Sequence, residues 1–140
     1  MAKKAAVAAS AGFAGFAVFQ LLLALGAPLG EAAWGGSNDG RLPTELRVGS
    51  GISIVVYALA AGLVLRRAGF RVRGLAFSVA RVGTWILVVL LALGALANFS
   101  SQSPWERFLL GPVSAVLAGL CLVVARSPGT ASAPDEDAVR

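Results

Sequence analysis

The residues that could bind or react lie mainly in two polar segments of this 140-residue chain. Eight of them are candidates for contact with a partner or a small polar ligand: Glu31, Trp34, Arg41, Glu45, Arg47, Trp105, Glu106 and Arg107. Both segments lie at predicted helix starts, where free backbone N–H groups and the helix dipole attract polar ligands. The alternative is local capping and surface ion pairs, which contribute little. Their spacing fixes no pair for acid–base chemistry, so we assign no catalytic residue.

Few residues of the chain could bind a metal ion or a cofactor. The chain has no histidine and a single cysteine, Cys121. A zinc cage of thiolates and imidazoles, a Ser/His/Asp triad and histidine-ligated haem are therefore excluded. Cys121 falls within an apolar stretch, where a small apolar packing role is expected. We predict no metal, no cofactor and no enzyme activity.

A few polar residues interrupt the apolar stretches. Gln20, Tyr57 and Ser114 are candidates for contacts inside the membrane, and no Asp or Glu accompanies them. A coupled ion pump normally places an ionisable group at this depth, which disfavours that function. Gln20 and Tyr57 reach comparable depth if the first two helices pair as an antiparallel hairpin. They then either hydrogen-bond to each other as packing residues or contact a ligand.

The composition indicates that a lipid bilayer surrounds the predicted helices. The chain is 57% hydrophobic and 14% charged, with a mean hydropathy of +0.79, whereas soluble domains are about 45–50% apolar and about 25% charged. The apolar residues form four long runs, each near the length needed to cross a hydrocarbon core of about 30 Å. We predict an all-α, four-helix transmembrane bundle over 1–126, with helices at about 5–26, 48–65, 75–97 and 104–125. Residues 127–140 are expected to form a disordered cytoplasmic tail.

Three local patterns refine this prediction. Ala24-Leu25-Gly26 resembles a signal-peptide cleavage site, but a signal peptide has an apolar core of only about 7–15 residues, so a retained first helix is preferred and cleavage is the alternative. Ser103-Pro104-Trp105-Glu106 has the pattern of a capping box with proline at the first helical position. Pro112 lies inside the last helix and predicts a kink.

The basic residues predict the orientation. Nine of the twelve fall on one side of the predicted spans, namely Lys3, Lys4, Arg66, Arg67, Arg71, Arg73, Arg81, Arg126 and Arg140. The positive-inside rule makes this side cytoplasmic, which gives an N-in, C-in protein with a short basic cytoplasmic loop and a longer first extracytoplasmic loop. The expected partners are the bilayer and anionic lipid head groups at the cytoplasmic arginines. Nucleic acid is not expected, because no recognition motif accompanies the charge.

Two further similarities are present. Leu22–Ala27 repeats as Leu90–Ala95, and Pro43 with Glu45 parallels Pro104 with Glu106, so the two hairpins are either a duplication or a chance match of low-complexity segments. The pattern GAPLG at 26–30, AWGG at 33–36 and LPTELR at 42–47 resembles the first outer loop of small four-span bacterial integral membrane proteins. The resemblance implies a shared fold and outer loop, and it implies no catalytic residue.

These observations lead to three hypotheses about function. The first is an interaction or accessory protein of the bacterial plasma membrane, whose outer loop contacts a partner or small polar ligand. It would bind another membrane protein or a second copy of itself. The second is a subunit of a small-molecule transporter or channel, and the third is a metal-free membrane enzyme. A water-accessible cavity lined by Gln20, Tyr57 and Ser114 would favour transport.

Overall fold

The computed structural model describes residues 1–128 and contains four long helices. Helix α1 spans Ala2–Leu25, α2 spans Thr44–Arg67, α3 spans Phe77–Phe99 and α4 spans Gly111–Arg126. Two short 3₁₀ turns, η1 (Gly30–Ala32) and η2 (Trp34–Gly36), lie in the first connection, and a π-helical segment, η3 (Glu106–Leu110), leads into α4. The prediction of an all-α bundle of four apolar helices is confirmed. The predicted tail lies, from residue 129 onward, outside the described residues.

The helix ends differ from the predicted ends by a few residues. Helix α2 begins four residues earlier than predicted, because Pro43 is extended and Thr44 already has helical conformation. Proline has no N–H to donate, and the first residues of a helix need no such donor. A helix can therefore begin directly at or after a proline. Helix α1 ends where Gly26 adopts a left-handed conformation with φ of 92°, and the N–H groups there cap the final carbonyls of the helix.

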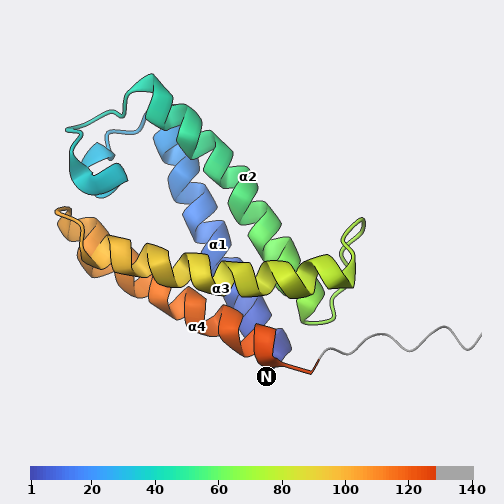
Figure 1. The fold of residues 1–140 in the computed structure, drawn as a ribbon. Coiled ribbons are helices and arrows are strands. Elements are labelled where there is room, and N and C mark those ends of the chain that lie inside the picture. Colours follow the sequence, from blue (N-terminus) through green and yellow to red (C-terminus); the bar gives the residue numbers. More distant parts are fainter. Residues whose placement is uncertain (129–140) are drawn as a thin grey trace, which may run out of the picture.

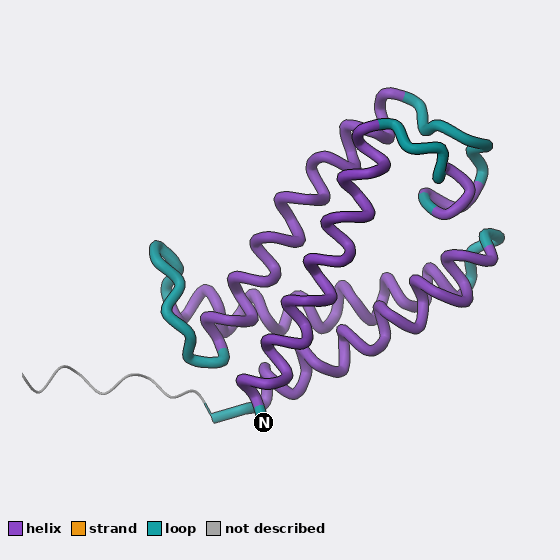
Figure 2. Tube along the Cα trace, turned by 180° about the vertical axis from the view of Figure 1, so that it is seen from behind, coloured by secondary structure: helices purple, strands orange, loops and turns teal. Residues whose placement is uncertain are grey.

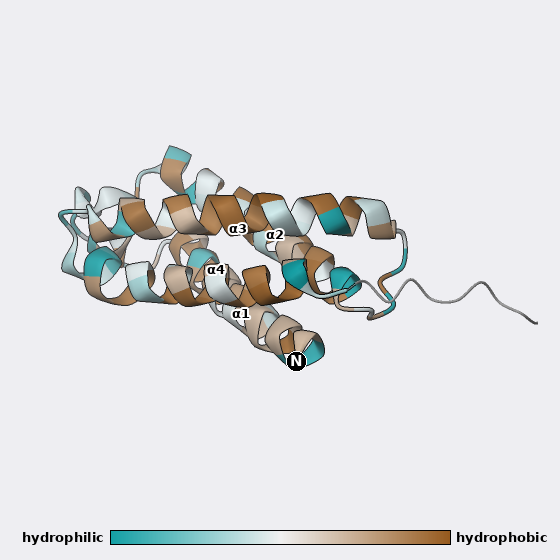
Figure 3. Ribbon diagram, turned by 60° about the horizontal axis from the view of Figure 1, so that its bottom comes forward, coloured by the Kyte–Doolittle hydropathy of each residue, from teal (hydrophilic) through white to brown (hydrophobic). Residues whose placement is uncertain are grey.

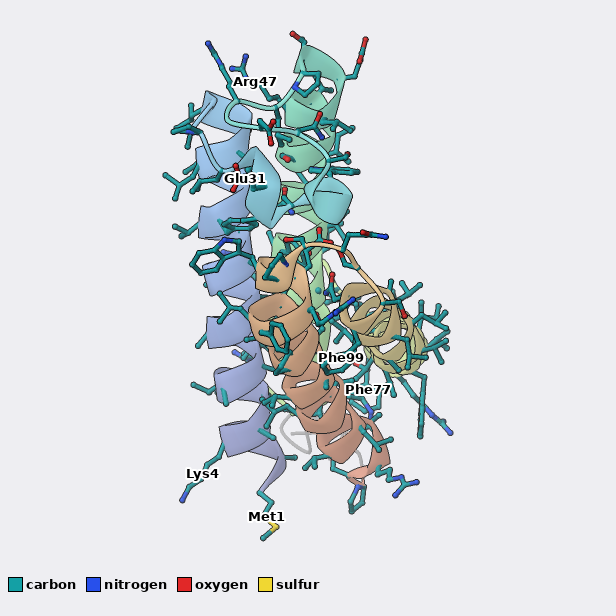
Figure 4. The ribbon with its side chains drawn as sticks, turned by 90° about the vertical axis from the view of Figure 1, so that its left-hand side faces the viewer. Met1, Lys4, Glu31, Arg47, Phe77 and Phe99 are labelled. Atoms are coloured by element: carbon teal, nitrogen blue, oxygen red, sulfur yellow. The ribbon has the colours of Figure 1, made fainter. Side chains whose placement is uncertain are left out.

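The helices form two antiparallel hairpins, α1 with α2 and α3 with α4. The hairpins cross and spread apart toward one end of the molecule, and η1 and η2 lie between them there (Figures 1 and 2). We call this end, which carries residues 26–43 and 100–105, the loop end. The opposite end carries the chain start, the connection 68–76 and residue 127, and we call it the basic end. Glu31 and Arg47 lie at the loop end, and Lys4 lies at the basic end (Figure 4).

A buried apolar core joins the two hairpins from the middle of the bundle to the basic end. Its buried side chains come from α1, α2 and α4, and include Phe13, Val64, Leu117, Cys121 and Val124. A Cβ added at Gly12 would lie 2.5 Å from Leu117 Cδ2, whereas one at Gly15 would meet nothing within 4 Å. Of these two glycines, only Gly12 lies at a close contact of α1 with α4.

Large apolar side chains cover the outside of all four helices. Figure 3 shows the apolar residues along the helix bodies and the polar residues mainly near their ends. Exposed examples on each helix are Leu21, Leu59, Leu93 and Val116. Each helix is long and apolar enough to cross a membrane, and an outer surface of this kind needs lipid around it. The chain is a multi-pass membrane protein.

The irregularity predicted at Pro112 takes the form of a π-helical turn. The N–H of Gly111 bonds to the carbonyl of Glu106, five residues earlier, directly before the proline that has no N–H to donate. Gly111 is buried, and a Cβ there would lie 2.9 Å from the ring of Phe99 on α3. The π-helical turn and the glycine therefore let the two helices of the second hairpin approach closely.

Candidate functional site

The loop between α1 and α2 folds back over the bundle through three residues with positive φ. Trp34 has φ of 54°, which is uncommon for a residue with a side chain, and Gly35 and Gly36 follow at 83° and 71°. A Cβ at Gly36 would lie 2.7 Å from Cβ of Ser103, on the connection between α3 and α4. The loop thus passes against the other hairpin at a point where only glycine fits.

Three hydrogen bonds fix this loop to both hairpins. Trp34 Nε1 donates to Ser50 Oγ on α2 at 3.2 Å, and Ser103 Oγ donates to the carbonyl of Glu31 at 2.7 Å. The backbone N–H of Gly35 donates to Glu106 Oε1 at 2.9 Å. The polar groups of the loop therefore bind within the chain, to residues far away in sequence.

Among residues 1–128, Glu106 is the one acidic residue that the fold buries, with 7% of its surface exposed. Only one of the two hydrogen bonds of the predicted capping box is formed. Ser103 Oγ accepts a hydrogen bond from the N–H of Glu106 at 3.4 Å, but the N–H of Ser103 donates to Ser101 Oγ and the Glu106 carboxylate binds Gly35. The carboxylate is thus turned from its own helix start toward the loop, where it also borders a cavity.

A cavity of about 220 Å³ lies beneath the loop, between the two hairpins. The residues predicted for intramembrane contacts, Gln20, Tyr57 and Ser114, all line it. They are joined by Phe16, Phe19, Ala33, Trp34, Ser53, Asn98, Glu106 and Leu110. Every long helix and the outer loop contribute, so the cavity depends on the complete fold.

Some polar groups of this cavity are engaged by hydrogen bonds within the chain, and others are free. Asn98 Nδ2 donates to Ser114 Oγ at 3.3 Å, and Ser53 Oγ donates to the carbonyl of Gly49, so these donors are engaged. Gln20 Oε1 is buried and accepts no hydrogen bond from residues 1–128, and Glu106 contributes a carboxylate group. No Lys or Arg within the described range lines the cavity. The expected hydrogen bond between Gln20 and Tyr57 is not formed.

Aromatic rings make up much of the remaining wall. Phe16, Phe19, Trp34 and Tyr57 all line the cavity. Tyr57 packs on Phe16 with ring centroids 5.3 Å apart and on Phe13 at 6.2 Å. Phe13 belongs to the buried apolar core, so these rings close the cavity on the side of the basic end.

The other predicted loop residues lie around the cavity and do not line it. Arg47 Nε donates to the carbonyl of Ala24 at 3.0 Å, which holds the end of α1 against α2, and Arg107 Nη2 donates to the carbonyl of Ser101 at 2.9 Å. The Arg41 guanidinium packs against Gly26. Glu45 is exposed in the first turn of α2. These charged groups act on backbone carbonyls or face outward.

Glu31 and Trp105 lie on a different surface of the loop end. Both border an apolar groove of about 460 Å³ between α1 and α4, together with Pro28 and Leu109. Trp105 is exposed, as expected for an interfacial tryptophan. The eight candidates therefore divide into a cavity pair, Trp34 and Glu106, and residues that lie elsewhere.

Four residues of the site had no place among the sequence-derived candidates. Ser50, Ser53 and Asn98 are small polar residues in or beside apolar helices, and Ser103 was considered only as a local cap. A signal was present for the first three, because a polar residue within a membrane helix needs a partner. Which partner it finds depends on tertiary packing.

Comparison of the chain with protein-family models, with curated proteins and with solved structures gives no match. The described residues also hold no group of three or more His, Cys, Asp or Glu side chains that could bind a metal ion.

Proposed function

We propose that this chain is an accessory protein of the bacterial plasma membrane that binds a small organic cation in the cavity beneath its outer loop. One observation carries the proposal: Glu106 places a buried carboxylate in a polar cavity that no basic residue of the described part of the chain lines. A buried charge without a partner is costly, and a bound cation would remove that cost. One backbone N–H at 2.9 Å satisfies only part of the carboxylate.

The lining supports an organic ammonium ligand. Four aromatic rings surround the same space as Glu106, and aromatic faces attract cations electrostatically. The side chain of Gln20 also lines the cavity and adds an amide group to its polar wall. A ligand of roughly choline size matches the cavity of about 220 Å³.

The inner end of the cavity is closed, which favours binding of a ligand over its conduction across the membrane. Tyr57, Phe13 and Phe16 pack together on its inner side, and fully buried core residues continue toward the basic end. A single chain of this kind offers a binding site and no path across the membrane. A transporter subunit is the second candidate, since the cavity lined by Gln20, Tyr57 and Ser114 would then meet a pathway supplied by other subunits.

The orientation is part of the proposal. Eight of the nine residues counted as cytoplasmic belong to the described part of the chain, and they come from segments at the basic end. The positive-inside rule then makes the loop end extracytoplasmic, so the ligand would come from outside the cell.

The experiment is isothermal titration of the protein in lipid nanodiscs with choline and with 3,3-dimethyl-1-butanol, its uncharged carbon isostere. We expect choline to bind and the isostere to bind at least about tenfold more weakly, a difference of about 1.4 kcal/mol. Glu106→Gln keeps an oxygen acceptor for Gly35 and removes the charge. It should weaken choline binding without changing the weak affinity for the isostere.

Glu45→Gln is the matched control, because Glu45 is the counterpart of Glu106 in the other hairpin but is exposed. It should leave choline binding as in the wild type. Equal affinity for choline and its isostere, or equal losses in both variants, would refute the proposal.

A further inference from the structure

A second cavity lies at the basic end, between α2, α3 and the end of α4. It measures about 500 Å³ and is lined by Arg67, Phe77, Arg81, Trp85, Ala125, Arg126, Ser127 and Pro128. Three arginines from three different helices therefore meet around one space. No carboxylate of residues 1–128 lines this cavity.

Arg67 is the central group of this cavity. Only 7% of its surface is exposed, which is unusual for an arginine. Its Nη2 donates to the carbonyls of Ala125 and Ser127 at 3.0 and 2.7 Å, so it caps the end of α4. This role uses one nitrogen of the guanidinium.

The other two nitrogens of Arg67 have no acceptor. Nε and Nη1 are buried and donate to nothing within the described part of the chain. The ring of Phe77 lies 5.4 Å from the guanidinium carbon and balances part of the charge. A ring accepts no directed N–H bonds of full strength, so buried donors remain unsatisfied.

The surroundings of Arg67 add positive potential and an apolar border. Arg81 and Arg126 are exposed at the cavity, and α3 begins beside it at Phe77 without a side-chain cap on its N-terminal N–H groups. Phe77, Arg81 and Trp85 are spaced by four residues and so share one face of α3. Trp85 extends this face toward the apolar body of the helix.

We infer that this cavity binds a phosphate-bearing anion through Arg67, Arg81 and Arg126. Guanidinium groups bind phosphate oxygens in bidentate geometry, and Arg67, Arg81 and Arg126 all line this cavity. This site differs from the general attraction expected of Arg66, Arg71 and Arg73, which surround a separate, more open space on the connection. The phosphate source is either an anionic phospholipid head group or a free phosphate.

The test is native mass spectrometry of the full chain after exposure to equal amounts of phosphatidylglycerol and phosphatidylcholine in detergent. The variant Arg81→Gln/Arg126→Gln removes two charges from the cavity and leaves the cap formed by Arg67 in place. Arg71→Gln/Arg73→Gln removes two charges from the same end outside the cavity. We expect the wild type and the second variant to retain one phosphatidylglycerol, and the first variant to lose it about tenfold.

Inorganic phosphate added as a competitor distinguishes the two sources. Displacement of the lipid at millimolar phosphate would identify a site for free phosphate, and undiminished retention would identify a lipid head-group site. Either result supports phosphate recognition. Equal loss of phosphatidylglycerol from both double variants, or equal retention of phosphatidylcholine by the wild type, would overturn the inference.

Discussion

Glu106 accepts a hydrogen bond from the backbone of Gly35, 71 positions earlier in the chain, at 2.9 Å. The bond joins the start of the last membrane helix to the tip of the first long loop. It places the buried carboxylate beside the aromatic residues of the cavity. The loop and the second hairpin therefore form one unit, and the predictions below test this arrangement.

Ser103 is predicted to hold the loop on the second hairpin. Its Oγ donates to Glu31 and accepts from Glu106, so Ser103→Ala removes both bonds. We expect a loss of about 1–2 kcal/mol in stability and faster amide exchange across residues 31–36. Thermal unfolding and hydrogen exchange in micelles measure these effects. Ser37→Ala, at an exposed loop position, is the control and should change neither.

Trp34 and Ser50 should be energetically coupled. The indole N–H donates to a hydroxyl that is fully buried in α2. Trp34→Phe leaves this hydroxyl without its partner, whereas Ser50→Ala removes the hydroxyl itself. A double-mutant cycle in unfolding free energy should give a coupling of about 0.5–1.5 kcal/mol. A coupling near zero would show that the loop is not seated as described.

Gly12 and Gly15 offer a direct comparison of packing on α1. A methyl group at Gly12 would clash with Leu117, and a methyl group at Gly15 faces open space. Gly12→Ala should destabilise the bundle by about 1–3 kcal/mol. Gly15→Ala should stabilise it by up to about 1 kcal/mol, because alanine favours helix. Unfolding in mixed micelles gives both values, and equal effects would contradict this packing of α1 on α4.

Labelling of single cysteines tests the proposed orientation. Native Cys121 is buried, so it should not react in the folded protein. An impermeant maleimide applied to intact cells should label Ser37→Cys, at the loop end, and spare Arg73→Cys, at the basic end. Opening the cells should make the second position reactive. The reverse pattern would place the ligand cavity on the cytoplasmic side and contradict the proposal.

Sequence patterns predicted the helices well, because hydrophobic length and proline positions act locally. Helical conformation begins at Pro104, as its place after Ser103 indicated. Gln20 and Tyr57 were expected at comparable depth, and both line one cavity together with Ser114. These features need only the spacing of residues along each helix.

Long-range contacts could not be predicted from these local sequence patterns. The capping pattern predicted that Glu106 binds its own helix start, but the carboxylate binds Gly35 in the loop. The positive φ of Trp34 that brings the loop there has no signature in the residue type. Likewise, Arg67 was counted as one of several loop arginines, whereas it is buried as a cap on α4. In each case tertiary packing decided which of several available partners the group found.

The most direct test of the cation site is a distance measured by solid-state NMR in bilayers, between the ¹³C-labelled carboxyl of Glu106 and the nitrogen of ¹⁵N-choline. Contact of an ammonium group with a carboxylate predicts strong dephasing at a separation of about 5 Å or less. Saturating choline that leaves the Glu106 signal without dephasing would contradict the account.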